Sequence, residues 1–397
     1  MDFAGSHTWA PGRPVRFASF AAGGLGLIVT LAAAAPPPAP HGPVTRLAGE
    51  LSGVSAVSPT DAWAAGNTNS GDIRLLHWNG TAWAQVARPH LAGVLNGVTA
   101  LSPTDAWAVG ERDTNTGSSQ TLALHWNGTH WTQVATPSPG RAPLLDDLSS
   151  VSAVSPGDAW AVGSFSPLRH RALPDHTLVL RWNGTSWIRV ASPNPSRSGN
   201  QLSGVSAVTP SDAWAVGMSS EGGGTLHTLI LHWNGTSWTQ MASPNPGFNF
   251  SELRGVDALS PTDAWAVGDY NTRAGAAKTL VLHWNGTTWT RVASPNPGVP
   301  SSTIFLAGVS ATSARDAWAV GEYTSNGEVV KPLVLHWNGA SWTHVASPHP
   351  AGVFGSELFG VNALSPGDAW AVGEVTGHVG NSTTLILHWN GTAWTQS

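Results

Sequence analysis

The stretch that decides the fold is LRGVDALSPTDAWAVGDYNTRAGAAKTLVLHWNGTTWTRVASPNP, which occupies Leu253–Pro297 of the 397-residue chain. It holds four runs rich in β-branched and aromatic residues, with Gly, Pro and Asn between them. We predict strands at Val256–Leu259, Ala264–Gly268, Thr279–Trp284 and Trp289–Ala293. The stretch therefore predicts one unit of four short antiparallel strands.

Two turn signals separate these runs. Ser260-Pro261-Thr262-Asp263 suits a type I turn, because Ser is favoured at its first position and Pro at its second. Asn285-Gly286 predicts a hairpin turn of type I′, in which both residues adopt positive φ. Within the third run, apolar side chains fall on both faces of the strand, as expected for a sheet packed between two others.

The same pattern fills the rest of the chain, because the motif repeats seven times. A period near 50 residues is typical of propellers and solenoids. Each copy has three tryptophans, which accounts for 21 of the 22 in the chain. We therefore predict an all-β, seven-bladed β-propeller over residues 51–397, with four antiparallel strands per blade. The copies open at Leu51, Leu95, Leu148, Leu202, Leu253, Leu306 and Leu358.

The repeat resembles known propeller families. A glycine-ended strand, a loop, an aromatic strand and W-x-x-V-x-x-P are similar to kelch-type blades, with Gly268, Trp289 and Pro295 in the corresponding places. The kelch double glycine is reduced to Val-Gly, and the kelch tyrosine is replaced by His-Trp. Tryptophan-rich tectonin-like propellers are an equally close resemblance. Either resemblance implies a propeller fold and a binding role.

Composition narrows the classes of partner and chemistry. Only 10% of the residues are charged and the net charge is -5, which argues against nucleic acid and anionic membranes as partners. The chain has no cysteine, which excludes disulfides, thiolate zinc sites and cysteine nucleophiles. It also excludes the Tyr–Cys crosslink of galactose-oxidase-type propellers. We expect no cofactor, no metal site and a monomer.

The amino end predicts export. Arg13 and Arg16 precede a run of apolar and small residues, Phe17–Ala35, so that residues 1–35 are typical of a secretory signal. An uncleaved membrane anchor is the alternative, because the run is almost long enough to span a bilayer. Residues 36–50 form a Pro-rich linker. We expect an extracellular or cell-surface protein, and we expect Val44–Leu47 to pack beside the shortened last strand and help to close the ring.

Strand order predicts one constant face and one variable face. The turn after the first strand of each copy and the Asn-Gly turn lie at the same end, and both are nearly constant. The loops between the second and third strands, and those between copies, lie at the other end and vary. Variation on a constant scaffold is typical of a binding face.

An aspartate and a histidine recur at the constant end of every copy but one. We interpret them as a structural pair within each blade, because a functional site is normally unique in a chain. In the third copy Arg181 replaces the histidine, and we expect it to contact Asp158. The other pairs are Asp61 and His77, Asp105 and His125, Asp212 and His232, Asp263 and His283, Asp316 and His336, and Asp368 and His388.

The candidate ligand site lies at the variable end of copies five to seven. The residue after the Val-Gly pair is acidic in each of them, namely Asp269, Glu322 and Glu374, and Tyr270 and Tyr323 follow two of these acids. Aromatic rings beside carboxylates suit a sugar or a basic protein segment. We expect these side chains to be exposed in one patch, with the nearby phenylalanines. Those are Phe248, Phe250, Phe305 and Phe354.

A second candidate is the long loop of the third copy, with Arg169, His170, Arg171 and His176, which could contact an anion. The preferred function is an exported binding module that recognises a glycan or a protein through the variable face. The alternative is a glycosidase or lyase that uses two of four carboxylates, Glu111, Asp269, Glu322 and Glu374, if a pocket holds two of them about 5–10 Å apart. A spacer or display module is a third reading.

Overall fold

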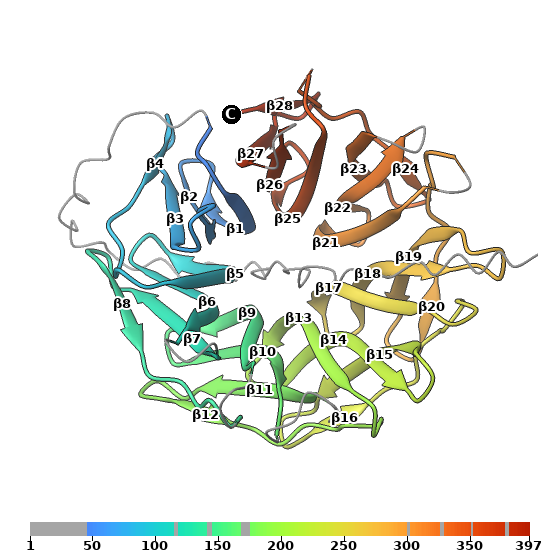
Figure 1. The fold of residues 1–397 in the computed structure, drawn as a ribbon, viewed down its shortest axis with the longest axis horizontal. Helices are drawn as coiled ribbons and strands as arrows, with labels where there is room; N and C mark the ends of the chain where they lie inside the picture. The colour runs from blue at the N-terminus through green and yellow to red at the C-terminus, as the bar shows by residue number, and fades with distance from the viewer. Residues whose placement is uncertain are drawn as a thin grey trace, which may run out of the picture.

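A computed structural model describes residues 46–114, 118–140, 145–167, 175–299, 302–325, 329–350, 352–377 and 381–397. These residues form 28 strands, which group into seven antiparallel units of four around a common centre (Figure 1). We number the units blade 1 to blade 7 in chain order. The predicted all-β fold with four antiparallel strands per unit is confirmed. A single parallel bridge, Val330 to Gly355, joins the sheets of blades 6 and 7.

Every blade takes its four strands from the centre outward in chain order. The innermost strands are β1 (Glu50–Ser58), β5 (Gly93–Ser102), β9 (Asp147–Ser155), β13 (Asn200–Thr209), β17 (Ser251–Ser260), β21 (Ile304–Ser313) and β25 (Gly355–Ser365). The second strands are β2 (Asp61–Asn67), β6 (Asp105–Asp113), β10 (Asp158–Phe165), β14 (Asp212–Glu221), β18 (Asp263–Asn271), β22 (Asp316–Ser325) and β26 (Asp368–Thr376). The third strands are β3 (Ile73–Trp78), β7 (Ser119–Trp126), β11 (His176–Trp182), β15 (Thr225–Trp233), β19 (Ala277–Trp284), β23 (Val329–Trp337) and β27 (Ser382–Trp389). The outermost strands are β4 (Trp83–Gln85), β8 (Trp131–Val134), β12 (Trp187–Arg189), β16 (Trp238–Gln240), β20 (Trp289–Arg291), β24 (Trp342–His344) and β28 (Trp394–Gln396).

The first two strands of blade 5 are longer than the sequence predicts. The second strand continues past Gly268, its predicted end, to Asn271. A Cβ atom at Gly268 would lie 2.0 Å from the carbonyl oxygen of Glu252, so the glycine serves a close approach of two backbones at a β-bulge. As a result Asp269 lies in a strand and not in a loop.

The Asn-Gly hairpin is present, but its turn differs from the predicted one. Trp284 pairs with Trp289, so the loop has four residues, Asn285–Thr288, in place of a two-residue type I′ turn. The Asn285 side chain accepts hydrogen bonds from the amides of Thr287 and Thr288 and from the Thr287 hydroxyl, at 2.8–3.0 Å. This side chain replaces the backbone bonds that a tighter turn would make.

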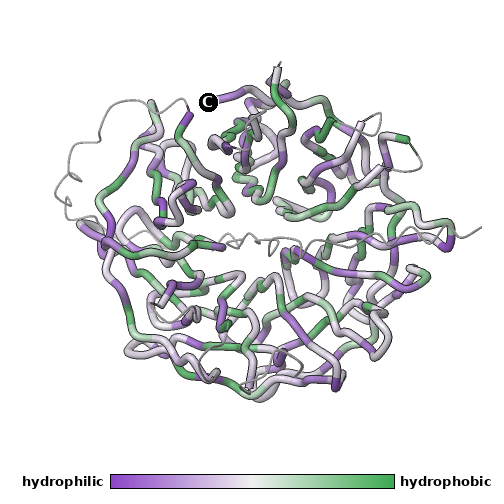
Figure 2. The backbone as a smooth tube through the Cα atoms, viewed as in Figure 1, coloured by the Kyte–Doolittle hydropathy of each residue, from purple (hydrophilic) through white to green (hydrophobic). Residues whose placement is uncertain are grey.

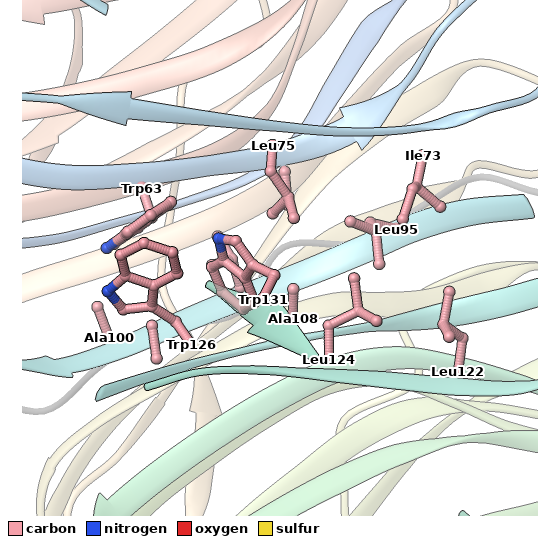
Figure 3. Packing of buried hydrophobic residues seen from close by; sticks show 13 residues of the cluster. Trp63, Ile73, Leu75, Leu95, Ala100, Ala108, Leu122, Leu124, Trp126 and Trp131 are labelled. Carbon is pink, nitrogen blue, oxygen red and sulfur yellow. The ribbon is translucent and has the colours of Figure 1, made fainter. Parts of the chain in front are cut away.

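The hydrophobic core lies between blades. Trp63 of blade 1 packs against Trp126 and Trp131 of blade 2, with ring centroids 4.9 and 5.0 Å apart (Figure 3). Hydrophobic residues recur along the strands around the whole ring (Figure 2). The contact repeats at every interface and closes the ring, because Trp370 of blade 7 packs in the same way against Trp78 and Trp83 of blade 1.

Hydrogen bonds of one kind join the innermost strands at six of the seven junctions between blades, whereas the Thr99 hydroxyl of blade 2 has no partner among the described residues. A polar side chain in one blade accepts a hydrogen bond from the backbone amide of an alanine in the next, as Ser206 does from Ala258 at 3.0 Å. Asp257 accepts from Ala311 at 2.7 Å, and Asn362 accepts from Ala56 at 2.9 Å across the junction of blades 7 and 1. The polar residues at this position are Ser55, Thr99, Ser152, Ser206, Asp257, Ser310 and Asn362.

The predicted aspartate–histidine pairs are confirmed. The imidazole Nε2 lies 2.7–3.4 Å from the aspartate oxygen in all six blades that have both residues. In blade 3, Arg181 instead makes a two-pronged contact with Asp158 and lies over the Trp160 ring, 4.9 Å from its centroid. Each histidine ring lies against the corresponding tryptophan ring of its own blade, with ring centroids 4.2–4.4 Å apart, so the pair is part of the scaffold.

The segment before β1 reaches across to blade 7. The Leu47 carbonyl accepts from the Thr384 amide at 2.8 Å, and the Leu47 amide donates to the Thr384 hydroxyl at 3.1 Å. Arg46 donates to Gln396 of the short last strand at 3.3 Å. The predicted packing near this strand is thus found for Arg46 and Leu47, while residues 44 and 45 lie outside the described residues.

The predicted signal or anchor, residues 1–35, also lies outside the described residues. Within the part of the chain that the structure describes, no helix is long and apolar enough to cross a membrane.

Candidate functional site

The variable loops gather at one face of the ring, here called the variable-loop face. It carries the loops between second and third strands and the connections between blades. At this face the ends of the two inner strands of each blade place one residue of each strand side by side. We call these seven pairs the inner-end ring: Glu50 and Asn67, Val94 and Glu111, Asp147 and Ser164, Gln201 and Met218, Glu252 and Asp269, Phe305 and Glu322, and Glu357 and Glu374.

In blade 5 the inner-end ring holds a buried ion cluster. Arg254 donates from Nε to Asp269 Oδ1 at 3.0 Å and from a terminal nitrogen to Glu252 Oε2 at 3.1 Å. All three residues are at most 8% exposed. The guanidinium also lies over the ring of Phe305 from blade 6, 4.6 Å from its centroid, so the cluster bridges two blades.

Blades 6 and 7 add three more carboxylates. Glu322 forms a hydrogen bond with Glu357, which requires one of the two carboxyl groups to carry a proton. Glu374 pairs with Glu357 across β25 and β26. Glu322 and Glu374 are each 7% exposed. Five carboxyl groups and one guanidinium thus lie at the inner ends of three consecutive blades.

Burial weakens the ionisation of these acids. It raises the pKa of Glu252 to about 7 and the pKa of Asp269 above its usual range, although Arg254 favours both ionised forms. Burial, together with the neighbouring Glu357, also holds the pKa of Glu322 well above its usual range. The cluster therefore contains carboxyl groups that can donate as well as accept hydrogen bonds near neutral pH.

A smaller acidic group lies across the ring in blade 3. Asp147 accepts hydrogen bonds from the hydroxyls of Ser164 at 2.6 Å and Ser149 at 2.8 Å. Burial raises its pKa to about 6, and Glu111 of blade 2 acts in the same direction. Its local hydroxyl partners explain how this carboxyl group is accommodated.

The structure corrects the expected exposure of the site. Asp269, Glu322 and Glu374 were expected on the surface, yet all three are buried, because the second strands extend past the glycine and pair with the first. Nor do the tyrosines join the acids in one patch. Side chains alternate along a strand, so Asp269 faces blade 6, whereas Tyr270 packs against the core between blades 4 and 5.

The two tyrosines are half-buried at the rim. Tyr270 lies under Arg291, whose guanidinium is 5.5 Å from the ring centroid, and Tyr323 meets His344 edge to face at 5.9 Å. Of the candidate phenylalanines, Phe248 and Phe354 are 59% and 55% exposed. Phe305 lies in β21 under Arg254 and is not a loop residue.

The second candidate is only partly described. Arg169, His170 and Arg171 lie outside the described residues. His176 begins β11 and meets Phe165 edge to face, with ring centroids 5.4 Å apart. It is therefore part of the side of blade 3, and the anion contact stays a prediction.

Sequence reasoning missed half of the acidic cluster. Glu252, Arg254 and Glu357 lie on the innermost strands, which were assigned only as small and crowded. The signal that could have found the two glutamates is the residue before the opening leucine of each copy. Among the described residues, no group of three or more His, Cys, Asp or Glu side chains could hold a metal ion.

Comparisons with known proteins support the fold. No protein-family model matches the chain, and no curated protein matches it in sequence. An ulvan lyase from a new family of polysaccharide lyases aligns with a TM-score of 0.56 at 10% identity, over 96% of this chain and 97% of that one. The β-propeller domain of the trilobed protease of Pyrococcus furiosus, described as an open velcro topology, aligns with a TM-score of 0.50 at 9% identity, over 88% and 97%.

A fucose-specific lectin from Aleuria aurantia also aligns, with a TM-score of 0.45 at 13% identity, over 77% of this chain and 99% of that one. The antiparallel units of four strands, together with the alignment to the Pyrococcus furiosus domain, define the class of fold as a β-propeller. At these identities the likeness is one of fold alone, and the kelch-like or tectonin-like character of the repeat stays a resemblance.

Proposed function

We propose that this protein is an exported ligand-binding β-propeller that recognises a glycan through the inner-end ring of blades 5 to 7. The observation that carries the proposal is the group of four buried carboxyl groups, Glu252, Asp269, Glu322 and Glu374, with the half-buried Glu357 beside them and Arg254 among them. Buried charges cost stability unless they are well paired. The scaffold does not need them, because blade 4 has the uncharged residues Gln201, Ser203 and Met218 at the positions of Glu252, Arg254 and Asp269.

The chemistry of the cluster suits hydroxyl groups. A sugar hydroxyl both donates and accepts hydrogen bonds, and a set of partly protonated carboxyl groups does the same. A basic protein segment is the competing ligand, since it would pair with the ionised carboxylates.

The test is a screen of the full chain against an array of neutral glycans and a set of lysine-rich peptides, at pH 6 and pH 8. A glycan ligand should bind at both values. Preference for the peptides, with affinity rising toward pH 8 as the carboxyl groups ionise, would replace the glycan by a basic protein partner. Release of shortened or unsaturated sugars during incubation would instead favour the enzyme, with Glu111, Asp269, Glu322 and Glu374 as the candidate residues.

A further inference from the structure

A cavity of about 390 Å³ lies on the variable-loop side of blade 4, outside the acidic cluster. Its walls come from the end of β14, the start of β15, the segment after β16 and the connection from blade 3. Its volume lies in the range of small-molecule sites. The lining residues are Pro195, Ser196, Ser219, Glu221, His227, Thr228, Gln240, Met241, Ala242, Ser243 and Asn245.

The cavity exists because one side chain is small. The rim position, two residues after the constant glycine of each second strand, holds Phe165 in blade 3, Tyr270 in blade 5 and Tyr323 in blade 6. These three rings pack against the core between their own blade and the preceding one. Blade 4 has Ser219 there, and no ring fills the space.

Blades 3 and 5 also close this region with neighbouring side chains. In blade 3 Arg189 lies over Phe165, 4.3 Å from the ring centroid, and in blade 5 Arg291 covers Tyr270. The residue of blade 4 that corresponds to both arginines is Gln240, which is exposed. In this blade the rim position and the position above it are therefore both small and polar.

Several polar side chains line the cavity. The Ser219 hydroxyl and the amide of the exposed Gln240 are both part of this lining. His227 Nε2 lies 3.5 Å from Glu221 Oε2, which leaves the second oxygen of this carboxylate available. The hydroxyls of Thr228 and Ser243, on one wall of the cavity, form a hydrogen bond with each other at 2.6 Å. Met241 supplies an apolar side chain to the lining.

We infer that this cavity binds one pyranose unit of a neutral glycan. A pyranose offers hydroxyls that both donate and accept, which match Ser219, Gln240 and Glu221, and an apolar C–H face, which matches Met241. The site is separate from the inner-end ring and does not depend on the function proposed for that ring.

The decisive variant fills the cavity with the residue that blades 5 and 6 already carry. Ser219→Tyr should melt like the wild type, because three other blades accept a ring at this position. Ser219→Ala is the matched control, since it leaves the space open. The probes are the methyl glycosides of glucose, galactose and mannose, measured by saturation-transfer NMR and by calorimetry.

We expect at least one probe to bind the wild type with a millimolar dissociation constant, and Ser219→Tyr to weaken it by about tenfold or more, while Ser219→Ala stays within about threefold. Gln240→Ala, an exposed substitution that leaves the fold unchanged, should also weaken binding. The inference would be overturned if no probe binds at about 10 mM, or if Ser219→Tyr and Gln240→Ala both bind the probe as tightly as the wild type does. Substitutions in the acidic cluster should leave this binding unchanged, which separates the two sites.

Discussion

Arg254 and Asp269 form a buried ion pair, 3.0 Å from Nε to Oδ1, at the point where the two inner strands of blade 5 end. Because Glu252 shares the same guanidinium, removal of the arginine leaves two buried carboxyl groups without their cation. Arg254→Ser should therefore lower the free energy of unfolding by about 3–5 kcal/mol. Chemical denaturation at pH 7 measures the change.

The matched control for Arg254→Ser is the triple variant Glu252→Gln, Arg254→Ser, Asp269→Met, which gives blade 5 the residues of blade 4. It removes the charges together, so it should recover most of the lost stability and remain within about 1–2 kcal/mol of the wild type. If the triple variant is as unstable as the single one, the cluster is required by the scaffold, and the argument for a functional role loses its basis.

A second prediction concerns Asp257, which accepts one of the hydrogen bonds between innermost strands. Burial raises its pKa to about 7. The folded state therefore holds a proton that the unfolded state releases near pH 4, and the stability contributed by the protonated form is lost as pH rises from about 4 to about 7. Asp257→Asn should remove this loss, because Asn362 performs the same role in blade 7.

The Asp257→Asn variant should match the wild type near pH 4 and exceed it by up to roughly 4 kcal/mol above pH 7. Denaturant unfolding across this pH range gives the difference curve. The subtraction cancels the parallel contributions of Glu252 and Asp147, which also have raised pKa values. A flat difference curve would show that Asp257 is ionised in the folded protein.

Ring closure gives a third prediction. Leu47 exchanges two hydrogen bonds with Thr384 and packs against the core shared by blades 7 and 1. Deletion of residues 36–47 should therefore lower the free energy of unfolding by about 2 kcal/mol, since each hydrogen bond contributes about 1 kcal/mol and the leucine adds buried area. Deletion of residues 36–43 is the control and should change nothing. If both deletion variants have the same melting temperature, the segment before β1 does not help to close the ring, and the tryptophan contacts between blades 7 and 1 close it.

The scaffold was predictable because its signals are local and repeated seven times. The aspartate–histidine pairs and the contact of Arg181 with Asp158 follow from strand order alone. The environment of the acids was not predictable, because Gly268 has the sequence pattern of a strand end. In the structure this glycine instead permits the close approach of two backbones, and the strand continues past it. Burial of Asp269 depends on that approach. The pairing of Arg254 with acids on two strands is likewise a tertiary contact that no spacing in the sequence indicates.

The rim position also shows that the role of a side chain depends on tertiary packing. Tyr270 and Tyr323, the only tyrosines in the sequence, were predicted to be exposed ligand-site residues, yet both pack against the core between blades. The informative residue is Ser219, because a serine in place of a ring leaves a space in blade 4; blade 1 also has a small residue at this position, Thr68. The constant glycine aligns this position in the sequence, but only the structure shows that it borders a cavity.

The most direct test of the central claim compares the affinity of the glycan found in the screen for two variants of blade 5. One is the triple variant that gives the inner-end ring of this blade the uncharged residues of blade 4. The other is His283→Arg, which copies Arg181 of blade 3 at the opposite, constant face. The account predicts that the triple variant binds at least about tenfold more weakly while His283→Arg binds like the wild type. Unchanged affinity in a folded triple variant would contradict it.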